Sequence, residues 1–160
     1  MIKLYRVDDR LVHGQVVEGW LPYVKADEIA VVSDEIASDG LRVNIMNFAT
    51  PENVNLKIFT LKDAVAYMSE AENNPRNVMV LFPGLNEAEV MFENGVKMGT
   101  LNIGGMLYTA CRNLSVGQAV FLNDNDKKII KKLFAGGVKM DVRGVPSDNS
   151  LNLGALVEKE

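Results

Sequence analysis

Short apolar runs alternate with segments of helical periodicity along the chain, and this alternation restricts the folds open to it. The run "NVMVLFP" (77–83) is almost continuously apolar, as expected of a strand covered on both faces. Strand and helix alternate about five times, which indicates the α/β class, with an open, mostly parallel β-sheet and helices on both faces. Strands are expected at 2–7, 28–33, 53–60, 77–83, 100–105 and 138–146, and helices at 14–24, 34–50, 86–99, 123–137 and 151–160, with one more beginning at Leu61.

Helix-end signals support several of these boundaries. Thr60 and Asp63 have the spacing of a capping box, and Asn86 is a suitable N-cap for the helix that follows it. Gly40 weakens the prediction of one helix over 34–50. Residues 106–122 fit no single helix, so "MLYTACR" and "QAVFL" are interpreted as the arms of a hairpin around "NLSVG".

Length, charge and cysteine content set the broad class. A chain of 160 residues fits one domain, expected to span 1–160. Its net charge of −4 argues against nucleic acid as a partner, and "KKIIKK" is expected on the solvated face of an amphipathic helix. The single cysteine, Cys111, forms no intrachain disulfide and is typical of a reducing compartment. With neither a signal-peptide pattern nor a run of about 20 apolar residues, a cytoplasmic location is expected, any membrane association coming through a partner.

The only histidine, His13, follows the first predicted strand in the stretch "RVDDRLVHGQV". Parallel sheets bind ligands beyond the carboxyl ends of their strands, where the loops 8–14, 33–35, 83–86 and 104–106 should gather. Arg10 can bind phosphate oxygens in a bidentate manner, and Asp8 or Asp9 can hold one imidazole nitrogen so that the other stays nucleophilic. These groups suit phosphoryl transfer on to and off an imidazole.

Other chemistries have weaker support. A lone histidine near a helix start is often a cap or a surface residue. One histidine and one cysteine predict no metal site, although Asp8, Asp9 and Asp34 could form a nonspecific magnesium site. Cys111 and His13 could form a thiol dyad, but the interpretation of Cys111 as a small, buried apolar residue is favoured. The chain contains no nucleophile elbow, P-loop or dinucleotide motif, and Gly104 and Gly105 of "NIGGM" are interpreted as a turn or a close backbone approach.

The stretch "RVDDRLVHGQV" closely resembles the active-site loop of IIB components of the bacterial phosphoenolpyruvate-dependent sugar phosphotransferase system (PTS), mannose/fructose/sorbose family. The resemblance continues in "VVSDE" (31–35), "LNIGGM" (101–106) and "GVKMDVRGVPSD" (137–148). It implies a cytoplasmic phosphocarrier, a protein-Nπ-phosphohistidine–sugar phosphotransferase without a cofactor. Such a protein accepts a phosphoryl group from a IIA component and passes it to a sugar during uptake through the membrane components IIC and IID.

The same resemblance assigns roles to individual residues. It makes His13 the phosphoryl carrier through Nδ1, with Arg10 on the phosphoryl oxygens and Asp8 and Asp9 in the catalytic loop. Supporting positions are expected at Arg6, Gly14, Gln15, Ser33 and Asp34.

The resemblance also leaves questions open. Around Cys111 and Arg112 the match is poor, because many members carry a glycine-arginine pair nearby, and the role of Arg112 is not assigned. The sugar, the oligomeric state and the aspartate that orients His13 are open too. The alternative function is a regulatory or binding module that keeps the fold without transferring phosphate. A phosphatase or kinase acting alone is disfavoured because no nucleotide motif is present.

Overall fold

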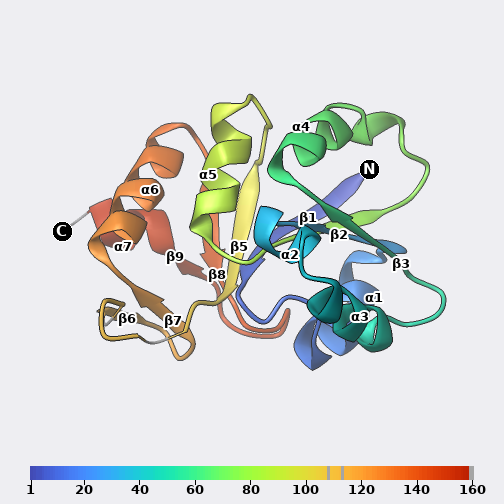
Figure 1. Cartoon of the computed structure of the whole chain (residues 1–160). Helices are drawn as coiled ribbons and strands as arrows, with labels where there is room; N and C mark the ends of the chain where they lie inside the picture. The colour runs from blue at the N-terminus through green and yellow to red at the C-terminus, as the bar shows by residue number, and fades with distance from the viewer. Residues whose placement is uncertain (108, 113, 159–160) are drawn as a thin grey trace.

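The computed structural model describes residues 1–107, 109–112 and 114–158. A seven-stranded sheet with the order β3-β2-β4-β1-β5-β8-β9 forms its centre (Figure 1). The first six strands of that order run parallel, and β9 pairs antiparallel to β8 at one edge. The strands are β1 (Ile2–Asp8), β2 (Glu28–Val32), β3 (Asn55–Phe59), β4 (Val78–Phe82), β5 (Thr100–Gly105), β8 (Lys139–Val142) and β9 (Leu151–Asn152).

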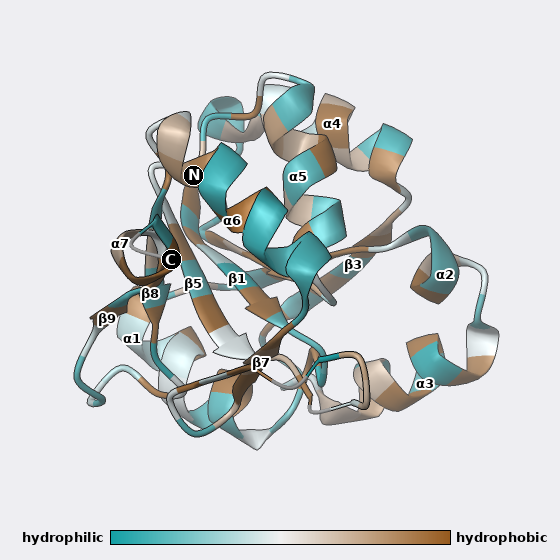
Figure 2. Cartoon of the chain, turned by 90° about the vertical axis from the view of Figure 1, so that its left-hand side faces the viewer, coloured by the Kyte–Doolittle hydropathy of each residue, from teal (hydrophilic) through white to brown (hydrophobic). Residues whose placement is uncertain are grey.

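Helices cover both faces of this sheet, which confirms the predicted fold class. Figure 2 shows α4, α5 and α6 above the sheet and α1 and α3 below it. A π-helical segment, η1 (Gln15–Trp20), leads into α1, and a short 3₁₀ turn, η2 (Ala71–Asn73), follows α4. The α-helices are α1 (Leu21–Val24), α2 (Asp34–Ala37), α3 (Gly40–Ala49), α4 (Leu61–Ser69), α5 (Leu85–Glu93), α6 (Asp124–Ala135) and α7 (Leu153–Glu158).

Strand β4 explains why the apolar run at 77–83 has no polar face. Its five residues are all fully buried. Val78, Val80 and Phe82 pack into the hydrophobic cluster under α4–α7, while Met79 and Leu81 pack into the cluster on the opposite face. Because successive side chains of a strand point to opposite faces, a strand between two helical layers must be apolar at every position.

The helices expected over 34–50 and 86–99 differ from the predictions, the second ending at Glu93. The helix expected over 34–50 is two helices, because the Asp39 side chain accepts the Arg42 backbone N–H and caps a new helix, α3, that begins at Gly40. Helix α5 is capped by Gly84 rather than Asn86, which lies inside the helix. The predicted cap at Thr60 is confirmed, since its hydroxyl accepts the Asp63 N–H.

The structure confirms only part of the hairpin predicted over 106–122. Its arms are β6 (Leu114–Val116) and β7 (Val120–Leu122), joined through Gly117 at φ +64°. The prediction of "MLYTACR" as the first arm is therefore wrong, whereas the second arm is confirmed. Positions 108 and 113 of that prediction, and 159–160 of the expected terminal helix, lie outside the described residues.

The last predicted strand is shorter than expected and ends at Val142, because the chain then turns at Gly144 and Val145, whose N–H groups bond Asp148. The expected terminal helix is confirmed from Leu153 onwards, after the two residues of β9. Trp20, at the end of η1, is buried at 1 % exposure.

Candidate functional site

The His13 loop follows β1, which lies between β4 and β5 in the middle of the sheet. A tight turn starts it, in which the Leu11 N–H donates to the Asp8 carbonyl at 3.0 Å and Leu11 adopts φ +56°. Leu11 and Val12 are buried in the hydrophobic cluster that also contains Val16 of η1. Two apolar side chains thus anchor the loop to the sheet and hold the next residue, His13, at the carboxyl edge.

The Asp8 carboxylate is the centre of the site. Its Oδ2 lies 3.0 Å from His13 Nε2 and 2.9 Å from an Arg6 guanidinium nitrogen. Its Oδ1 accepts the Arg10 backbone N–H at 3.1 Å and the Arg10 Nε–H at 3.2 Å. Asp8 therefore orients the imidazole, which answers the question that two neighbouring aspartates left open in the sequence.

The charges around Asp8 keep it ionised. Burial disfavours the carboxylate, but the hydrogen bond with His13, the positive charge of Arg6 and the Arg10 N–H outweigh it and lower the pKa of Asp8 to about 2. At neutral pH the Asp8 carboxylate therefore accepts a hydrogen bond from the protonated Nε2 of His13. The Nδ1 of a neutral His13 ring then carries the lone pair.

Arg6 is buried at 0 % exposure and serves as a fixed counter-ion to Asp8. It bonds Asn102 Oδ1, and it donates to the backbone carbonyls of Arg143 and Gly144 at 3.1 and 3.0 Å. Its guanidinium also lies 5.2 Å from the centre of the Trp20 ring. Sequence reasoning missed Asn102, which the fold brings to Arg6 from the neighbouring strand β5.

Gly104 is required by this packing. A Cβ atom built at Gly104 would overlap the Arg6 guanidinium. The close backbone approach predicted for "NIGGM" is therefore present, and the group that approaches is a buried arginine.

Arg10 and Gln15 form the accessible side of the site. The Arg10 side chain is 42 % exposed, and its terminal nitrogen donates to Gln15 Oε1 at 2.9 Å. Both residues border a cavity of about 340 Å³ that Arg143 and Gly144 also line. Gly14 precedes η1, and a Cβ there would meet open space. A cation thus faces an open cavity while its other bonds fix it to Asp8.

Asp9 is bonded to the segment that follows β5. Its Oδ2 accepts the Leu107 N–H at 2.6 Å, and its Oδ1 is buried without a hydrogen-bond partner among the described residues. Burial, helped by the neighbouring Asp8 charge, raises the pKa of Asp9. Asp9 therefore connects the loop to the segment after β5.

The segment after β5 is fixed further along by Arg112. The Arg112 guanidinium pairs with both carboxylate oxygens of Asp126, at 2.7 and 3.1 Å. Asp126 in turn accepts the Asn123 N–H and completes the capping box of α6. Cys111, next to Arg112, is exposed rather than buried as expected, because it lies on this surface segment.

Ser33 and Asp34 are not brought together with His13. Ser33 caps α2 by accepting the Ile36 N–H at 3.1 Å, and Asp34 accepts the Leu61 N–H of α4 at 2.8 Å. They follow β2, which β4 separates from β1. In the part of the chain that the structure describes, no group of three or more His, Cys, Asp or Glu side chains could hold a metal ion.

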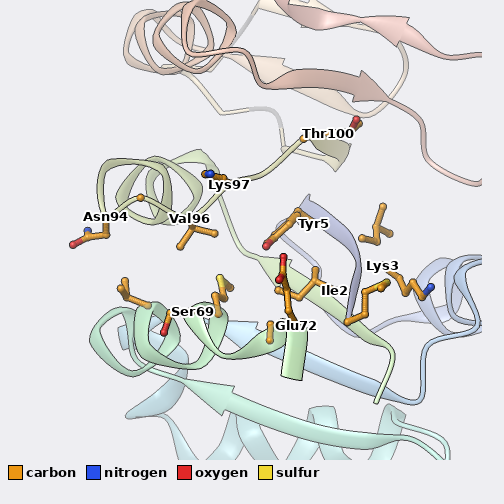
Figure 3. Close-up of a pocket in the computed structure, with 16 residues that line it drawn as sticks. Ile2, Lys3, Tyr5, Ser69, Glu72, Asn94, Val96, Lys97 and Thr100 are labelled. Carbon is orange, nitrogen blue, oxygen red and sulfur yellow. The ribbon is translucent and has the colours of Figure 1, made fainter. Parts of the chain in front are cut away.

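A larger cavity, of about 510 Å³, lies at the opposite ends of the strands from His13 (Figure 3). Its walls come from the starts of β1 and β5 and the ends of α4 and α5, with Tyr5, Ser69 and Val96 among its residues. Burial raises the pKa of Tyr5 to about 12, so its phenol is neutral at physiological pH. This cavity therefore lies at the amino ends of β1 and β5, away from the His13 loop at their carboxyl ends.

Comparisons with known proteins agree with this arrangement. The family model described as PTS system sorbose subfamily IIB component matches residues 2–160. The sorbose-specific EIIB component of Klebsiella pneumoniae is 34% identical over 95% of this chain and 92% of its own length. The crystal structure of the IIBSor domain of the Klebsiella pneumoniae sorbose permease superposes with a TM-score of 0.91 at 32% identity, over 99% of this chain and 97% of that one.

The mannose-specific EIIAB component of Escherichia coli (strain K12) is 36% identical over 99% of this chain. This chain spans about half the length of that relative, 49%. No helix among the described residues is long and apolar enough to cross a membrane. A match over nearly the whole chain, with relatives of similar length above 30% identity, settles the family: this chain belongs to the IIB components of the PTS sorbose subfamily.

Proposed function

We propose that the protein is the phosphocarrier of a sugar transporter, and that His13 carries the phosphoryl group on Nδ1. One observation supports this above the others, the bond between His13 Nε2 and the ionised Asp8 carboxylate. It fixes the ring and its tautomer, so the opposite nitrogen is the nucleophile. His13 keeps 18 % of its side chain exposed, which leaves it within reach of a donor.

The transfer occurs in two displacements at phosphorus. In the first, the Nδ1 lone pair of His13 attacks the phosphorus of a donor phosphohistidine, and the donor's P–N bond breaks. In the second, a sugar hydroxyl oxygen attacks the phosphorus, the P–Nδ1 bond breaks, and the hydroxyl proton ends on the released imidazole or in solvent. Arg10 binds the phosphoryl oxygens throughout, because its guanidinium is exposed on one side and fixed by Asp8 on the other.

The partners follow from this role. The donor is a IIA component, and the acceptor sugar is presented by the membrane components IIC and IID at the cytoplasmic side of the membrane. Relatives carry the names mannose-specific, sorbose-specific and fructose-specific, so the substrate class is a sugar.

Phosphorylation in a reconstituted system tests the proposal. The chain is incubated with phosphoenolpyruvate, the general phosphotransferase proteins and a mannose-family IIA, and its intact mass is measured. We expect one phosphoryl group per chain, through an acid-labile and base-stable bond, and NMR of the labelled imidazole should assign it to Nδ1.

His13→Ala is the matched variant, since this partly exposed ring can be removed with the loop still anchored by Leu11 and Val12. It should remain folded by circular dichroism and accept no phosphate. Labelling of His13→Ala would disprove the assignment of the carrier. A folded wild-type chain that stays unlabelled would favour the alternative, a binding module of the same fold.

A further inference from the structure

Helix α3 is apolar on both of its faces, although only one of them meets the protein. Met46 is 6 % exposed and packs into the cluster below the sheet. On the other side Leu41, Ile45 and Phe48 are 71 %, 58 % and 92 % exposed. Their spacing of four and three residues puts the three side chains on one stripe of the helix, named here the α3 stripe.

Helix α3 and the His13 loop lie on the same face of the sheet. Met46 belongs to the same buried cluster as Leu11 and Val12, so α3 and the loop pack against one hydrophobic core on this face of the sheet. Figure 2 shows α3 below the sheet, on the side toward which β1 and β5 point. A protein surface that covers His13 can therefore reach the stripe as well.

A second exposed apolar side chain borders the loop. Leu107 is 63 % exposed, and its backbone N–H is bonded to the Asp9 carboxylate. The loop that carries His13 thus connects directly to Leu107 and shares its packing with the helix of the α3 stripe. Large exposed apolar side chains with polar residues around them are typical of a protein docking surface.

The size of the stripe fits a transient partner. Three large side chains exposed to this degree offer on the order of 400 Å² of apolar surface. A stable interface buries about 800 Å² on each partner, so the stripe alone is too small for a permanent dimer. A carrier that must release its donor after every transfer needs the smaller kind.

The charges near the stripe favour a soluble protein over a lipid surface. The only basic side chain of α3 is Arg42, which pairs with Glu35 at 3.5 Å, and Asn44 and Asn47 are the other exposed polar residues next to the stripe. Anionic headgroups attract clusters of lysine and arginine, and α3 carries none.

We infer that the α3 stripe is the docking surface for the phosphohistidine-bearing IIA donor. This inference rests on the proposed function, because it requires that His13 receive its phosphoryl group from a protein. Phe48, the most exposed side chain of the stripe, is the main anchor, since aromatic side chains dominate the energetics of docking surfaces.

Steady-state transfer from phospho-IIA to His13 tests the inference. Phe48→Ala should raise the KM for phospho-IIA about tenfold and leave kcat unchanged, because the side chain binds the donor and does not touch the reacting atoms. Ile45→Ala should act in the same direction. With donor in excess, both variants should still accept one phosphoryl group per chain.

Leu156→Ala is the matched control, because Leu156 is 46 % exposed on α7, on the opposite face of the sheet, and its loss should leave KM unchanged. Equal KM values for wild type and Phe48→Ala would overturn the inference. So would a wild-type dimer that Phe48→Ala dissociates, or a Phe48→Ala loss confined to sugar phosphorylation by IIC/IID membranes. A wild-type chain that is never labelled would reject the proposed function itself.

Discussion

On one side of the His13 loop the Asp8 carboxylate is surrounded by two guanidinium groups and an imidazole, whereas on the other side Asp9 accepts a single hydrogen bond from the described residues, from Leu107. The groups around Asp8 lower its pKa to about 2, whereas burial raises the pKa of Asp9. The pKa values of two identical residues one position apart are therefore shifted in opposite directions.

This difference separates two tasks within one loop. The Asp8 side holds the imidazole and the arginines in fixed positions before any substrate arrives, which is what transfer between heavily charged groups requires. The Asp9 side joins the loop to the segment that leads to the hairpin and α6. We expect the Asp8 side to control both stability and transfer, and the Asp9 side to control local order.

The largest effect is expected from isosteric substitutions of the two carboxylates, which test the difference between Asp8 and Asp9 directly. Asp8→Asn leaves the buried Arg6 cation without a counter-charge, which should lower the free energy of unfolding by about 3 kcal/mol and nearly abolish labelling of His13. Asp9→Asn keeps an oxygen for the Leu107 N–H and removes a disfavoured charge, so its effect should stay within about 0.5 kcal/mol. Urea unfolding measures both variants, and equal losses would contradict the division.

Acid unfolding sharpens the same contrast with a smaller effect. Because folding lowers the pKa of Asp8 from 3.8 to about 2, its stabilisation is complete above about pH 4 and is lost as the pH falls to about 2. The loss amounts to about 2 kcal/mol. Asp9 has the opposite sign: its raised pKa destabilises the fold above that pKa, and protonation relieves the cost.

Unfolding free energies of wild type and both Asn variants, measured at about pH 5 and about pH 2.5, separate these contributions. Asp8→Asn should lose less stability on acidification than wild type, and Asp9→Asn should lose slightly more. Parallel acid profiles for wild type and Asp8→Asn would mean that Asp8 is not held ionised by its neighbours.

The sequence revealed the Asp8 side because that side is local. Arg6, Asp8, Arg10 and His13 lie within eight positions, and a strand followed by a helix start was enough to bring them together. The choice between Asp8 and Asp9 was beyond sequence reasoning, since both residues are the same type in the same turn. It depended on Leu107, 98 positions from Asp9.

The fold shows the same limit. Strands buried on both faces have an apolar pattern that can be recognised from the sequence alone, so the six parallel strands of the central sheet were predicted, whereas β9 was not. The hairpin arms are only three residues long, too short for a period of two to be recognised. The break between α2 and α3 depends on one capping bond from Asp39, which the apolar periodicity of 34–50 conceals.

The smallest expected effect concerns Arg112, on the Asp9 side. Arg112→Ala removes a two-point ion pair with Asp126, but Asp126 keeps the Asn123 N–H, and the arginine side chain is already 30 % exposed. We therefore expect a loss of about 1 kcal/mol, discounted for solvent screening, and faster hydrogen exchange at the hairpin amides. Labelling of His13 should change by no more than about twofold, since Arg112 serves the segment that Asp9 anchors and does not hold the imidazole. Arg112→Lys keeps the charge without the two-point geometry, so its free energy of unfolding should lie between those of wild type and Arg112→Ala. If Arg112→Ala stopped labelling as completely as His13→Ala, the Asp9 side would take part in transfer and the division between the two carboxylates would have to be abandoned.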